Sequence, residues 1–116
     1  MTKQITIGGK SYLLRLTNSG ARLAQELLKR PFGQILKDLS FLDVEVIRVL
    51  LYACLRPEQP EMKLEAVDAL MDEPGFHLLE ISEPIGEAVA AYISGGSKPA
   101  LVDTKKKARG SQQMVS

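Results

Sequence analysis

The stretch SFLDVEVIRVLLYACLR, residues 40–56, limits what this chain can fold into more than any other. Its only charges before Arg56 are Asp43, Glu45 and Arg48, and residues 49–55 are apolar on every side of a helix. Such a helix has to be covered by other elements on most of its sides. The stretch therefore predicts a central helix at about residues 41–55, with the rest of the chain packed around it. The Ser-x-x-acid form of residues 40–43 predicts a capping box at its start.

The beginning of the chain has the alternation typical of strands. In ITIGGKSYLLRL, residues 5–16, apolar and polar side chains alternate on both sides of Gly8-Gly9. A glycine pair supplies the positive φ angles that a tight hairpin turn requires. We therefore expect a β-hairpin over residues 3–16. Its outer edges could pair with strands of another copy.

Apolar residues at helical spacing predict further helices. With the hairpin and the central helix they define an α+β, mainly α fold: an N-terminal β-hairpin followed by a compact bundle of about four to five helices. We expect residues 1–95 to form a single globular domain and residues 96–116, which have no periodicity, to form a disordered basic C-terminal tail. The other expected helices are at about residues 19–29, 32–39, 63–71 and 76–94, the last kinked or restarted at Ser82-Glu83-Pro84.

The overall composition fits one ordinary soluble domain. The chain has 116 residues, of which 45% are hydrophobic and 25% charged. The single cysteine, Cys54, excludes a disulfide within one chain and fits a reducing compartment. The start, MTKQITIGGK, has no apolar signal core, and no apolar run is long enough to span a bilayer. We expect an intracellular protein without a membrane partner.

Charges are segregated along the chain. Residues 1–30 carry six Lys or Arg against one Glu, residues 31–94 carry four against twelve acidic residues, and residues 95–116 carry five against one. A basic start, acidic middle and basic end could be complementary within the fold or between copies of the chain. Ordinary solvated faces are the alternative interpretation.

No group of residues has the pattern of a catalytic, cofactor or metal site. His77 is the only histidine, and Cys54 sits in an apolar run, as buried cysteines do. The sequence around Lys10, GGKS, lacks the spacing of a phosphate-binding loop, and a strand follows it instead of a helix. We therefore expect a protein without catalytic, cofactor-binding or metal-ligating residues.

Two features are candidates for contact with a partner. One is the apolar helix, which could leave one side open to a partner helix. The other is the basic tail, which could contact acidic proteins or, in a salt-sensitive way, phosphates, although nucleic acid is the less favoured partner. The candidate residues are Val49, Leu50, Tyr52 and Ala53 in the helix and Lys105, Lys106, Lys107 and Arg109 in the tail.

Taken as an ordered set, residues 3–94 resemble the tail assembly chaperones of long-tailed bacteriophages, prophages and gene transfer agents. Four segments carry the resemblance: ITIGGKSYLLRLT, NSGARLAQELLKRPFGQIL, DVEVIRVLLYACLRPEQPEMKLEAVDALMDE and IGEAVAAYI. Their order is hairpin, helix, short helix, apolar helix ending in LRP, and small helix ending in Leu-Met-Asp-Glu.

The resemblance implies a non-enzymatic function. Proteins of this family bind the tape measure protein and keep it soluble in the host bacterial cytoplasm during tail morphogenesis. They leave as tube subunits assemble, so they are absent from the mature virion. Implied partners are the tape measure protein and the tail tube protein, while association with further copies of the chain is suggested by the hairpin edges and the segregated charges. Many members have a longer form made by ribosomal frameshifting. In this chain the A-rich codons of Lys105-Lys106-Lys107 would be the candidate slippery site.

Two other functions remain open. A structural tail component, such as a tube or connector protein, could pair its hairpin edges into a ring, but tube proteins are mostly β. A small helical regulator could bind nucleic acid through the basic ends, but the longest helix is apolar and no basic recognition helix is visible.

Overall fold

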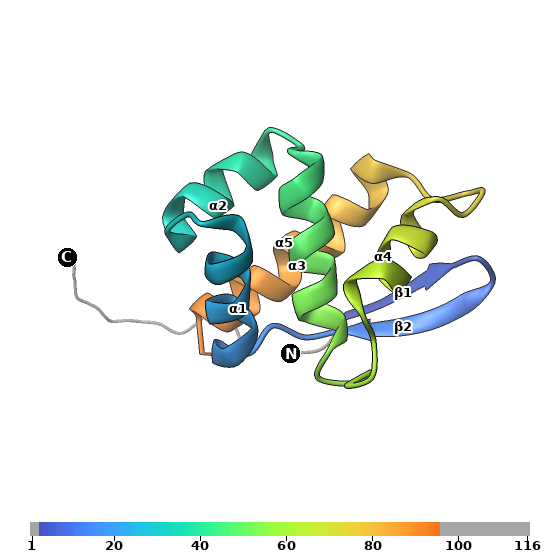
Figure 1. Ribbon diagram of the computed structural model, residues 1–116, viewed down its shortest axis with the longest axis horizontal. Coiled ribbons are helices and arrows are strands. Elements are labelled where there is room, and N and C mark those ends of the chain that lie inside the picture. The colour runs from blue at the N-terminus through green and yellow to red at the C-terminus, as the bar shows by residue number, and fades with distance from the viewer. Residues whose placement is uncertain (1–2, 96–116) are drawn as a thin grey trace.

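The computed structural model describes residues 3–95, which form one hairpin and five helices (Figure 1). This confirms the expected α+β, mainly helical fold class. The expected disordered tail, residues 96–116, lies outside the described residues. The strands are β1 (Lys3–Ile7) and β2 (Lys10–Leu14), and the helices are α1 (Asn18–Leu28), α2 (Phe32–Ser40), α3 (Val44–Leu55), α4 (Leu64–Met71) and α5 (Leu78–Ile93).

The hairpin has the predicted turn and face. Strands β1 and β2 pair antiparallel with Ile5 opposite Tyr12, and Gly8 and Gly9 have φ angles of 59° and 78°. Alternate side chains on one face, among them Ile5, Tyr12 and Leu14, are buried. That face packs on α3 and α5, which gives a two-stranded sheet the apolar support that it needs.

Helix α3 is the centre of the fold, as the sequence predicts. It contacts the other four helices and strand β2, and in Figure 1 it lies between α1 and α2 on one side and α4 on the other. Every residue from Val49 to Leu55 is buried except Tyr52, which is half-buried. Arg48 fastens α3 to α4, because its guanidinium forms a two-point ion pair with the Asp68 carboxylate.

The start of α3 differs from the prediction. Residues 41–43 form the turn between α2 and α3 instead, in which the Asp43 amide donates to the Asp38 carbonyl (3.1 Å) and the Leu42 amide donates to the Leu39 carbonyl (3.0 Å). This is the hydrogen-bond pattern of a Schellman motif, with Leu42 in the left-handed region at φ 60°. Ser40 therefore ends α2, and the predicted capping box does not form.

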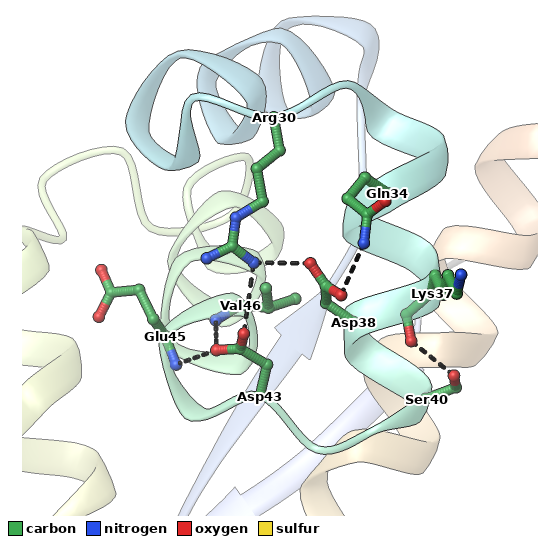
Figure 2. A network of polar contacts seen from close by, with 8 residues as sticks. All are labelled: Arg30, Gln34, Lys37, Asp38, Ser40, Asp43, Glu45 and Val46. Atoms are coloured by element: carbon green, nitrogen blue, oxygen red, sulfur yellow. Dashed lines mark hydrogen bonds and ion pairs between the residues drawn. The ribbon is translucent and has the colours of Figure 1, made fainter.

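Asp43 caps α3 in place of Ser40 (Figure 2). Its Oδ1 accepts hydrogen bonds from the amides of Glu45 (3.0 Å) and Val46 (3.3 Å). Its Oδ2 lies 3.3 Å from Arg30 Nη1, which also donates to Asp38 Oδ2 at 2.8 Å. One guanidinium thus ties the segment after α1 to both α2 and the start of α3.

The Asp43→Ala variant is expected to unfold with a free energy about 1–2 kcal/mol lower than the native chain near pH 7, since the helix loses its cap. Burial by itself would raise the pKa of Asp43, but the hydrogen bonds from Val46 and Arg30 hold the pKa below its usual 3.8. A lowered carboxyl pKa stabilises the fold above the unfolded pKa, and this stabilisation is lost as the pH falls through the native pKa. The difference between the two proteins should therefore shrink below about pH 4.

Urea unfolding followed by circular dichroism at neutral and acid pH measures this difference. Asp43→Asn is the matched control, because asparagine caps about as well as aspartate and removes only the charge. A cost for Asp43→Ala that is absent near pH 7, or one that stays constant down to pH 3, would contradict this role of Asp43.

Helix α5 continues through its proline. The predicted restart at Ser82-Glu83-Pro84 does not occur, because residues 78–93 form one helix with Pro84 inside it. Ile81, Ile85 and Val89 line its buried face against the core.

Candidate partner-binding groove

An open hollow of about 580 Å³ lies between α1 and the C-terminal end of α3. We call it the arginine groove because its lining includes three arginines together with small and apolar residues. It is lined by Arg15, Thr17, Ser19, Gly20, Arg22, Leu23, Glu26, Ala53, Arg56 and Pro57.

The two walls of the arginine groove are held close together by local geometry. The Arg15 amide donates to the Cys54 carbonyl (3.0 Å), which fixes the segment before α1 on the end of α3. Thr17 then caps α1, its Oγ1 accepting from the Gly20 amide at 3.1 Å. At Gly20 a Cβ would lie 3.2 Å from the Ala53 carbonyl oxygen, so the absence of a side chain permits the close approach of α1 to α3.

The three arginines differ in how they are held. The Arg56 guanidinium lies over the Tyr52 ring, 5.6 Å from its centroid. Arg15 Nε is 3.5 Å from Glu58 Oε2, in a pair whose side chains are 43% and 38% exposed. Arg22 is exposed on α1 and forms no ion pair within residues 3–95. All three are accessible to solvent, so an anionic group could reach each of them.

Two further hollows adjoin the groove, one along the second half of α1 and one between the segment before α1 and helix α5. A hollow of about 390 Å³ shares Arg22 and Glu26 with it and extends to Arg30. Another of about 340 Å³ shares Arg15 and Thr17 and extends to Tyr92 on α5. Arg30 differs from the groove arginines, since its guanidinium is already bound to Asp38 and Asp43 (Figure 2).

Most of the apolar residues expected to contact a partner are buried in the core. Val49, Leu50 and Ala53 are 1%, 0% and 0% exposed, because α1, α5 and β2 cover α3 from different sides. In this conformation their side chains are therefore closed to a partner. Tyr52 is half-buried and lies beneath Arg56, and Ala53 is among the residues that line the groove, so these two of the four are close to an accessible site.

The expected tail residues cannot be placed. Lys105, Lys106, Lys107 and Arg109 all lie outside the described residues.

Cys54 and His77, for which the sequence indicates no catalytic or metal-binding role, lie in different surroundings. Cys54 is completely buried, and this burial raises the pKa of its thiol to about 12. His77 is exposed at the residue before α5. Within residues 3–95, no group of three or more His, Cys, Asp or Glu side chains is arranged to hold a metal ion. None of the helices in this part of the chain has the length and apolar character needed to cross a bilayer.

Two features of the surface have no signal in the sequence. Arg15 and Arg22 belong to the basic start of the chain, but nothing in the sequence indicates that Arg56, which lies beyond the central helix, joins them. Phe41 and Val44 were counted in the covered helix, yet they are 74% and 55% exposed beside the α2–α3 turn.

Comparison of the chain with protein-family models, with curated proteins and with solved structures gives no match.

Proposed function

We propose that this chain is a non-enzymatic tail assembly chaperone that binds the tape measure protein and keeps it soluble during tail morphogenesis. The proposal rests on the resemblance of residues 3–94 to that family. The observation that carries it is the arginine groove, an open hollow of about 580 Å³ lined by three arginines together with small, polar and apolar residues. In this proposal the protein acts in the host cytoplasm and is absent from the finished particle.

A groove of this composition suits a polypeptide partner. The apolar lining residues Leu23 and Pro57 can contact the apolar side chains of a helix, which is a common mode of helix recognition. Charged walls guide the approach and select the partner more than they add affinity. Reversible binding of this kind is what a chaperone needs, because it has to release its partner when tube subunits assemble.

Co-expression with the tape measure protein of the same phage or prophage tests the proposal. We expect most of the tape measure protein in the soluble fraction and a complex on size-exclusion chromatography, whereas the tape measure protein alone is expected in the pellet. An equally insoluble tape measure protein with and without this chain, and no complex, would contradict the chaperone function.

A structural tail component is the second candidate. The observation in its favour is the hairpin, since the outer edges of β1 and β2 have no strand beside them within residues 3–95. Mass spectrometry of purified particles separates the two. A chaperone is expected to be absent, whereas the chain in amounts comparable to the tube protein would favour a structural part.

A further inference from the structure

We infer that the arginine groove is a receptor for an acidic amphipathic α-helix, whose carboxylates are bound by Arg15, Arg22 and Arg56. This deepens the proposed function, on which it rests for the idea that the partner is a long helical protein. It adds the chemical class of the segment that is recognised and the residues that recognise it.

The donors needed for this recognition are present and free. An arginine has five N–H donors in one plane and binds a carboxylate through two of them. Arg22 forms no ion pair within residues 3–95, and the Glu58 pair occupies only part of the Arg15 guanidinium. The Arg56 guanidinium carbon lies 5.6 Å from the centroid of the Tyr52 ring, and the Arg56 side chain forms no ion pair within residues 3–95, so its N–H donors are available to a carboxylate.

The charges and apolar residues of the groove lining favour a peptide over a nucleic acid as the ligand. Glu26 is among the lining residues and Glu58 is paired beside Arg15, so negative charges are interspersed with the arginines. A phosphate backbone carries a charge at every nucleotide and would be repelled at these two positions. A helix has discrete charges, which can match the arginines and avoid the glutamates. Leu23 and Pro57 give apolar contacts that phosphates cannot use.

The dimensions also suit a helix. Helix α1 has 11 residues and is therefore roughly 16 Å long, and the hollow that extends from Arg22 to Arg30 lies along its second half. About three turns of a partner helix would cover this length. Acidic residues three or four positions apart lie on one face of such a helix, roughly 5–6 Å from one another, so a single face can offer carboxylates to more than one arginine.

Fluorescence anisotropy of a labelled synthetic peptide tests the inference on the full chain. The probe is a helical peptide of about 18 residues with a leucine stripe flanked by glutamates at i, i+4 spacing. We expect the double variant Arg22→Glu/Arg56→Glu to bind it at least about tenfold more weakly than the native chain. We also expect weaker binding as the salt concentration rises, and no binding of the charge-reversed lysine peptide.

A second double variant controls for overall charge. Lys10→Glu/Lys63→Glu changes the net charge equally, at exposed positions on the hairpin turn and before α4, outside the groove. We expect this variant to bind the glutamate peptide within about twofold of the native chain. Equal weakening by both double variants would overturn the inference. The inference would also be overturned if a single-stranded DNA oligonucleotide of similar charge bound the native chain more tightly than the peptide does, and if the groove variant no longer bound this oligonucleotide.

The failure of this inference can be told from the failure of the chaperone function. If the groove variant keeps the tape measure protein soluble as well as the native chain does, the groove inference is wrong and the chaperone function stands. If the peptide binds as expected but the tape measure protein stays insoluble with the native chain, the chaperone function is wrong and the groove inference stands. Equal urea unfolding midpoints for both variants ensure that folded proteins are compared.

Discussion

Replacing Leu50 with alanine is expected to lower the free energy of unfolding by about 3–4 kcal/mol. Leu50 is 0% exposed and sits in the helix against which the hairpin and the other helices pack. The variant loses the free energy of transferring the removed side-chain atoms from water into the core. Because the neighbouring elements cannot close completely on the vacated space, the cost of a cavity is added to this loss. For a domain of this size such a loss is a large part of the total stability.

Leu79→Ala is the matched control, since it makes the same chemical change at a side chain that is 70% exposed. We expect a change within about 0.5 kcal/mol there. Urea unfolding of both variants, followed by circular dichroism, gives the two free energies. A cost at Leu50 no larger than at Leu79 would contradict the central position of α3.

The second large effect concerns the reactivity of Cys54. In the folded chain the thiol should react with a disulfide reagent near pH 8 at least about a thousandfold more slowly than a free cysteine, because the thiolate is the nucleophile and its formation is suppressed. Burial removes access and also raises the pKa of Cys54 to about 12. The release of the coloured thiol product measures the rate. Labelling of the native protein as fast as in urea would contradict the buried position.

The same pKa shift makes stability depend on alkaline pH. The folded thiol keeps its proton over a range in which the unfolded thiol, with a pKa near 9.0, loses it. The stabilisation is therefore complete below the unfolded pKa and is lost as the pH rises toward about 12, by up to about 1.4 kcal/mol per pH unit. Cys54→Ala should remove this component, so the native chain should lose more stability than the variant between pH 9 and 11. Parallel losses would exclude a contribution from the thiol.

Periodicity predicted the elements of the fold well because burial decides them. The all-apolar run from Val49 to Leu55 predicted a covered helix, and the alternation around Gly8-Gly9 predicted a hairpin with one buried face. The boundary between α2 and α3 was wrong for a local reason. A left-handed residue that ends a helix is usually glycine, but here it is Leu42, so the sequence has no recognisable stop.

The candidate site was less predictable than the fold. The basic character of residues 1–30 pointed to Arg15 and Arg22, but the groove exists only because Gly20 and Ala53 let α1 approach α3 and bring Arg56 beside them. That is a tertiary contact without a periodic pattern. The apolar candidates Val49, Leu50 and Ala53 proved buried because one apolar surface can serve either the core or a partner, and periodicity does not distinguish the two.

Hydrogen exchange of this chain, free and in complex with the tape measure protein, tests the central claim most directly. Backbone amides of a small peripheral helix exchange through local opening, and a bound partner suppresses that opening. We predict added protection in α1, residues 18–28, and in residues 53–57, with little change in α4. Protection confined to the hairpin or α4, or no added protection anywhere, would contradict partner binding at the arginine groove.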